Sequence, residues 1–155
     1  MNSYLPTLLV LAFIIELSGC TGLKTNPENQ SDIFPPEKFS VLKAELHGKP
    51  IIGSVNRAYA DYKRKSEYPW CLVISIALNS DSVNSSGLPL AEESKIAYTE
   101  EDQLVDSVKK ITTAHYIGHF FNDGFLDVYL YLDKPETVNS FLQKEKENPQ
   151  LKRGI

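Results

Sequence analysis

The sequence is poor in the residues and motifs that usually mark a chemistry. It has two cysteines and three histidines in 155 residues, with neither a Cys-x-x-Cys pair nor a His-Glu-x-x-His motif. A phosphate-binding glycine loop, a dinucleotide fingerprint and a Gly-x-Ser-x-Gly nucleophile elbow are also missing. The sequence therefore predicts no metal site, no cofactor and no recognisable catalytic motif.

A clustered excess of positive charge is missing as well. The formal net charge is −4 at pH 7, and the only cluster of basic residues is the short run YKRKSEY at residues 62–68. A nucleic-acid-binding domain would be expected to carry a basic face, whereas three adjacent basic residues more often form a solvated loop. We therefore expect no nucleic-acid partner.

The apolar run near the start of the chain is too short to cross a membrane. It extends from Leu8 to Ile15 as LLVLAFII, whereas a membrane-spanning helix needs about 20 apolar residues. A short start, an apolar stretch and then small residues are the layout of an export signal. Residues 1–19 are therefore predicted to be a signal peptide.

The four residues Leu17 to Cys20, LSGC, resemble the bacterial lipobox. This resemblance implies that the mature chain begins at Cys20 and that its thiol carries lipid, which anchors the protein to the cell membrane. Thr21 is not the Asp that usually retains lipoproteins in the inner membrane, so in a cell with two membranes we expect the outer one, facing the periplasm. The alternative is a cytosolic protein with an uncleaved leader.

The second cysteine, Cys71, has no intramolecular partner if Cys20 carries lipid. Its surroundings, PWCLVISIAL, predict a buried strand, in which a free cysteine behaves as a small hydrophobic residue. A catalytic thiol is the less favoured interpretation, because nothing in the sequence around it indicates a depressed pKa.

The rest of the chain divides into a tether, a domain and a short end. Residues 20–36 are polar and interrupted by prolines, which is typical of a tether. The domain is predicted at 37–149, and the charged residues 150–155 are expected to fray. It opens with a hairpin at 39–60 around the turn sequence HGKP, whose second arm could instead become helical after Ser54.

A strand, a helix, two strands and a helix follow the hairpin. The strand is CLVISIAL at 71–78, the helix covers 91–113, a tight turn at 122–124 joins the two strands, and the last helix begins after Asp133. Glu100, Glu101 and Asp102 are interpreted as capping the start of a helical turn after Thr99.

This order predicts an α+β domain, a ferredoxin-like sandwich with two helices on one face of an antiparallel sheet. It is preceded by the hairpin, and the final strand of the fold has no clear counterpart in the sequence. Either the hairpin at 39–60 covers the edge left by that strand, or the chain is truncated there. An unpaired edge could recruit another chain.

An ordered set of residues in this domain resembles the domain of unknown function 695 family. The set comprises Asn56, Pro69 with Trp70, Gly87 to Pro89, Gly118, Gly124 and Tyr131, and the similarity covers residues 38–148. The resemblance implies a ferredoxin-like domain related in shape to the bacterial regulators of the ribonuclease E inhibitor family. It implies no catalytic residue, because the family has no established activity.

One strand face is a candidate binding surface. Phe125, Tyr129 and Tyr131 alternate along one strand, with His115 and His119 on its predicted neighbour. The face is either open for recognition or covered by the N-terminal hairpin or the tether. The two histidines would lie about 13 Å apart along a strand at ~3.3 Å per residue, too far to share one metal ion by themselves.

We therefore expect a membrane-anchored, non-catalytic binding module in the cell envelope. Its partner would be another envelope protein or a polymeric ligand. Two alternatives stay open. One is an enzyme whose site is built from His115, His119, Asp127 and the tyrosines. The other is a cytosolic protein-binding regulator that keeps its leader.

The intact mass of the protein from its native host tests the predicted anchor. We expect a mass that corresponds to residues 20–155 plus acyl groups, because the lipobox-like cysteine would be both the cleavage point and the acylation point. Cys20→Ala should abolish the modification. An unmodified full-length mass would contradict the lipoprotein prediction and favour the cytosolic alternative.

Overall fold

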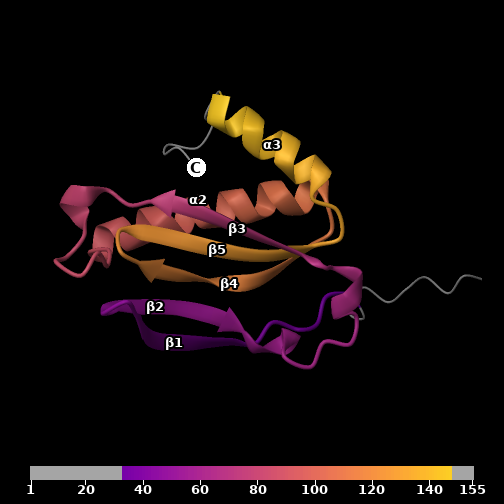
Figure 1. Ribbon diagram of the computed structural model, residues 1–155, viewed down its shortest axis with the longest axis horizontal. Helices are drawn as coiled ribbons and strands as arrows, with labels where there is room; N and C mark the ends of the chain where they lie inside the picture. Colours follow the sequence, from indigo (N-terminus) through magenta and orange to yellow (C-terminus); the bar gives the residue numbers. More distant parts are fainter. Residues whose placement is uncertain (1–32, 148–155) are drawn as a thin grey trace, which may run out of the picture.

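The computed structural model describes residues 33–147 as a five-stranded antiparallel sheet with two helices (Figure 1). The elements are β1 Phe39–Leu46, β2 Lys49–Asn56, β3 Trp70–Ala77, α2 Ala91–Ile111, β4 Ala114–Asn122, β5 Phe125–Leu132 and α3 Glu136–Glu147, with short 3-10 turns η1 Arg57–Tyr59, η2 Lys65–Glu67 and η3 Ser80–Ser82. The predicted α+β class and element order are confirmed. The signal peptide, Cys20, most of the tether and residues 150–155 lie outside the described residues.

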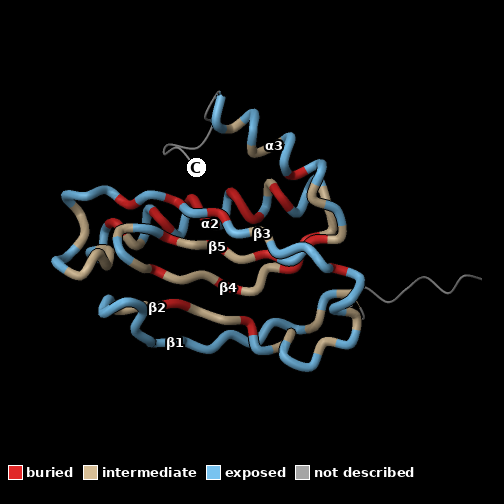
Figure 2. The backbone as a smooth tube through the Cα atoms, in the orientation of Figure 1, coloured by how far each residue is buried: buried red, intermediate tan, exposed pale blue. Residues whose placement is uncertain are grey.

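The hydrophobic core lies between one face of the sheet and both helices. On β5, the alternate residues Leu126, Val128, Leu130 and Leu132 are fully buried, as the period of two along the strand predicts. The helices contribute core residues at helical spacing, among them Ala97, Leu104 and Val108 of α2 and Val138 of α3. Figure 2 shows the buried positions concentrated on α2 and the strands beneath it.

Both helices therefore cover the same face, and the other face of the sheet carries no helix among the described residues (Figure 1). Each aliphatic side chain buried in this way contributes about 1.5–3 kcal/mol. None of the helices within residues 33–147 has an apolar stretch of the length needed to cross a membrane.

The strand order is β1-β2-β4-β5-β3. The N-terminal hairpin β1–β2 pairs with β4 and so extends the sheet at the end opposite β3. Of the two alternatives for the edge left by a missing final strand, the one in which this hairpin covers it is therefore wrong, because that edge belongs to β3. Within the described residues, β3 pairs with β5 on one side and with no strand on the other.

The predicted burial of Cys71 is also wrong, since its side chain is exposed. Cys71 pairs with Tyr131, and both side chains lie on the helix-free face. Leu72, Ile74 and Ile76 lie together against the core, but the sequence did not show that the sheet is covered on one side only. The alternate positions of β3 consequently face solvent.

An irregularity in β4 determines where its two histidines point. The register shifts between Tyr116 and Gly118, so that His115 pairs with Tyr131 while His119 pairs with Val128. One extra residue in a strand transfers every following side chain to the opposite face. His115 therefore lies on the helix-free face and His119 on the helix-covered face. The prediction that both histidines border the same surface is corrected.

Gly118 makes this irregularity possible. Its φ is +147°, and a Cβ at this position would overlap the carbonyl oxygen of Ser54 in β2. A residue with a side chain would therefore be strained and would push β2 away from β4.

Asn56 at the end of β2 also has a structural role. Its buried Oδ1 accepts hydrogen bonds from the backbone N–H groups of Lys38 and Ala58.

Candidate functional site

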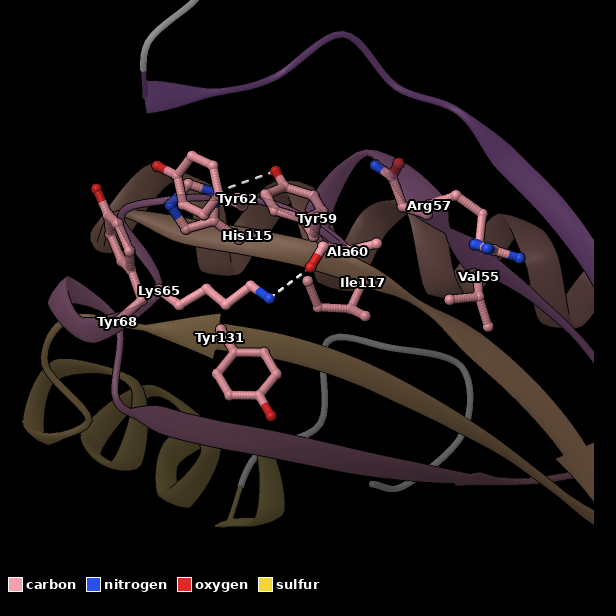
Figure 3. A pocket seen from close by; sticks show the side chains of 11 residues that line it. Val55, Arg57, Tyr59, Ala60, Tyr62, Lys65, Tyr68, His115, Ile117 and Tyr131 are labelled. Atoms are coloured by element: carbon pink, nitrogen blue, oxygen red, sulfur yellow. Dashed lines mark hydrogen bonds between the residues drawn. The ribbon is translucent and has the colours of Figure 1, made fainter.

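A pocket of about 460 Å³ opens on the helix-free face of the sheet (Figure 3). Its walls come from β2, from the segment 57–68 that follows β2, and from β4 and β5. The lining residues are Val55, Asn56, Arg57, Tyr59, Ala60, Tyr62, Lys65, Tyr68, His115, Ile117 and Tyr131. The volume is within the range of sites that hold small ligands.

The path of the chain explains why the pocket forms here. β2 and β3 follow one another in the sequence, but β4 and β5 lie between them in the sheet. The connection must therefore cross those two strands on one face, and the helices already occupy the other. It passes over the start of β4 and the end of β5, where Tyr59 and Tyr68 contact the ring of His115.

His115 is the buried centre of the site, with 1% of its surface exposed. Its ring centroid lies 4.0 Å from that of Tyr68, 5.0 Å from Phe34, 5.2 Å from Tyr59 and 5.4 Å from Tyr62. Nδ1 shares a hydrogen bond of 3.0 Å with the Tyr59 hydroxyl. Nε2 is buried and has no hydrogen-bond partner among the described residues.

This environment disfavours the charged imidazolium. Burial is the main cause that lowers the pKa of His115 to about 4, and the positive charges of Arg64 and Lys109 add to it. At neutral pH the ring is therefore uncharged. Burial also raises the pKa of Tyr59 to about 12, so the hydroxyl that faces His115 stays protonated.

Tyr62 fixes the chain that enters the domain. Burial raises the pKa of Tyr62, and its hydroxyl donates a hydrogen bond of 2.7 Å to the carbonyl oxygen of Ile33. The next residue, Phe34, packs on His115. The first described residues of the chain therefore lie against the pocket, so the predicted tether reaches the domain at this point.

Among the described residues, the charged groups that line the pocket are two cations, Arg57 and Lys65. The Lys65 ammonium donates a hydrogen bond of 2.5 Å to the carbonyl oxygen of Ala60. The neighbouring Arg64 instead binds Glu67 through two bonds of 2.7 and 2.6 Å. The basic run at 62–68, interpreted from the sequence as a solvated loop, thus contributes one wall of the site.

The helix-free face continues beyond the pocket as an exposed apolar surface. Tyr131 and Phe125 are 41% and 46% exposed, and Tyr129 packs edge-on against Phe120 with ring centroids 5.6 Å apart. The hairpin β1–β2 does not cover these rings, because it continues the sheet beside β4 and does not pack on its face. The structure thus brings Tyr131 and His115 together, with Tyr129 beside them and Phe125 at the far end of β5.

His119 belongs to a separate polar network on the other face. Its Nδ1 lies 2.9 Å from Glu101 Oε1 of α2, and the Tyr116 hydroxyl donates to the same carboxylate at 2.5 Å. Burial and this bond raise the pKa of Tyr116. The network connects α2 to β4.

The interpretation of Glu100, Glu101 and Asp102 as capping residues is wrong, because α2 begins at Ala91.

The residues that the enzyme alternative requires do not meet. His115 and His119 point to opposite faces, and Asp127 accepts a hydrogen bond of 2.5 Å from the Ser75 hydroxyl outside the pocket lining. Within residues 33–147, no three His, Cys, Asp or Glu side chains gather in a way that could hold a metal ion.

The family model described as a family of unknown function (DUF695) matches residues 37–155 of the chain. Neither the curated proteins nor the solved structures contain a match.

The lowered pKa of His115 predicts a loss of stability in mild acid. The folded state resists protonation of His115 between the ordinary pKa of 6.5 and about 4, whereas the unfolded chain accepts the proton. The stability that depends on neutral His115 is therefore fully present above pH 6.5 and is lost as the pH falls toward 4. It amounts to at most about 3 kcal/mol.

Urea unfolding at several pH values measures this effect. His115→Phe removes the titrating group, so its free energy of unfolding should fall less steeply than that of the native sequence between pH 6.5 and 4. Parallel curves for the two proteins would show that His115 titrates in the folded state as it does in the unfolded chain.

Proposed function

Because the chain belongs to the DUF695 family, a family of unknown function, its role has to be argued from its own surfaces. We propose that it is a non-catalytic binding module of the cell envelope, anchored to the membrane through lipid on Cys20. The binding site is the pocket around Tyr131 and His115, together with the exposed apolar face beside it.

The observation that carries this proposal is the pocket with its four tyrosines, Tyr59, Tyr62, Tyr68 and Tyr131. Tyrosine brings a large contact area and few rotatable bonds, so little conformational entropy is lost when a ligand binds. Hydrogen bonds hold two of these rings, through Nδ1 of His115 and through the Ile33 carbonyl. The walls are therefore in place before any ligand arrives.

The surface beside the pocket favours an extended partner. Exposed apolar side chains continue along the helix-free face on three strands, at Leu42 and Leu46 of β1, Val73 of β3 and Phe125 of β5. Exposed apolar surfaces of this kind often mark interaction sites. A protein segment or a polymeric ligand could lie along this face and insert one group into the pocket.

The chemistry of the lining favours binding over catalysis. Its histidine is buried and neutral, and its Nδ1 is already engaged by Tyr59. A general base needs access to the proton that it takes and a pKa near the working pH. In the described part of the chain, the lining holds no carboxylate, cysteine or serine that could act as a nucleophile or as a second acid–base group.

A neutral apolar dye, phenylnaphthylamine, tests the pocket. The full-length chain with Cys20→Ala serves as the parent, so that no lipid competes for the site. We expect one bound dye per chain with enhanced fluorescence. Tyr131→Ala should weaken binding about fivefold, because one aromatic wall is worth roughly 1 kcal/mol.

Tyr98→Ala is the matched control. Tyr98 is 42% exposed, almost the same as Tyr131, but it lies on α2 and contacts His119 and Phe121 on the other side of the sheet. Binding should be unchanged in this variant. Equal losses in both variants, or no saturable binding by the parent, would contradict the proposal.

A further inference from the structure

We infer that the pocket selects an anionic amphiphile, a ligand with one negatively charged head and an apolar body. This inference rests on the proposed binding function and names the chemistry of its ligand. It comes from the charges at the pocket and from the composition of its walls.

The two cations reach the pocket from different ends of the crossing segment. Arg57 belongs to η1 and Lys65 to η2, and both line the pocket (Figure 3). Lys65 uses one of its three N–H donors on the carbonyl of Ala60. Within residues 33–147, no hydrogen bond or ion pair holds the guanidinium of Arg57. Donors are therefore left for an anionic head.

Carboxylates near the site do not neutralise these cations. Among residues 33–147, no carboxylate belongs to the lining. Glu67 is held by Arg64 through both of its oxygens. Glu37 lies near enough to Tyr59 to contribute to its raised pKa, but it is not a lining residue. The two lining charges are thus both positive, which favours an anion over a neutral or cationic ligand.

The remaining walls require an apolar body as well as a charged head. Val55, Ala60 and Ile117 line the pocket between the tyrosine rings. A free phosphate or sulfate ion would leave these apolar groups uncovered and would gain nothing from their burial. A ring system or an acyl chain of modest length fits both the volume and the chemistry.

The position of the tether suggests one source for such a ligand. Ile33 lies at the pocket, and the chain between it and Cys20 can span at most about 45 Å at ~3.5 Å per residue. If Cys20 is lipidated, the pocket is held close to a membrane surface that presents anionic amphiphiles. A soluble fatty acid or aromatic acid has the same chemistry, so the test has to separate the two sources.

Two dyes with the same ring skeleton test the selectivity for an anion. Anilinonaphthalene sulfonate carries a negative charge that phenylnaphthylamine lacks. The parent with Cys20→Ala should bind the sulfonate more tightly. The double variant Arg57→Gln, Lys65→Gln should weaken sulfonate binding about three- to tenfold, since two exposed ion pairs with the sulfonate are lost, and should leave the neutral dye within twofold.

The control removes the same charge elsewhere. Lys144→Gln, Lys146→Gln changes two exposed lysines of α3, remote from the pocket, and should affect neither dye. If the sulfonate binds no better than the neutral dye, or if the double variant weakens both dyes equally, the inference fails while the pocket function stands. If neither dye binds, both fail.

Displacement of the sulfonate dye identifies the source. Monomeric laurate and vesicles containing phosphatidylglycerol are the two competitors, with phosphatidylcholine vesicles as the uncharged control. Displacement by laurate alone indicates a soluble ligand, and displacement by the anionic vesicles indicates the membrane. Either result supports an anionic amphiphile. Displacement by neither, or equal displacement by both kinds of vesicle, overturns it.

Discussion

The crossing from β2 to β3 is the constraint on which the rest of the site depends. These strands are consecutive in the chain, but β4 and β5 separate them in the sheet. With both helices packed on one face, the connection has to run over the other. An open antiparallel sheet would otherwise present a flat face. Here the connection raises a wall over one end of that face and so creates a pocket.

His115 holds this wall against the sheet. Four aromatic rings contact its imidazole, and contacts of this kind contribute about 0.5–1.5 kcal/mol each beyond the burial of their surface. Against this stands the buried Nε2, since a buried polar atom without a partner costs about 1–3 kcal/mol. The result is a neutral histidine enclosed by the rings of Phe34, Tyr59, Tyr62 and Tyr68.

The sequence was sufficient for the elements but not for their arrangement. Alternation along 125–132 correctly predicted that Phe125, Tyr129 and Tyr131 share a face, because a strand repeats every two residues. The predicted face of His119 was wrong. The irregularity before Gly118 depends on how closely β2 approaches β4, and no local sequence pattern reveals that distance. The start of α2 at Ala91 was predicted correctly, although Leu90 caps it without a side-chain hydrogen bond.

The candidate site itself was half predicted. Tyr131 and His115 were identified as members of a binding face, whereas Tyr59, Tyr62 and Tyr68 were not. These three belong to a connecting segment, and their role follows from the strand order, which depends on contacts far apart in the sequence. A tyrosine-rich segment between two predicted strands was the available signal. It becomes informative once those strands are known not to be neighbours.

The most direct test of this account is a nuclear Overhauser measurement on the ring protons of His115 in solution. If the segment 57–68 packs on His115, we expect strong cross-peaks from the His115 ring to the ring protons of Tyr59 and Tyr68, whose centroids lie 5.2 and 4.0 Å away. Absence of these cross-peaks, with the tyrosine rings averaging as they do in solvent, would show that the crossing segment does not pack on the sheet and that no preformed pocket exists.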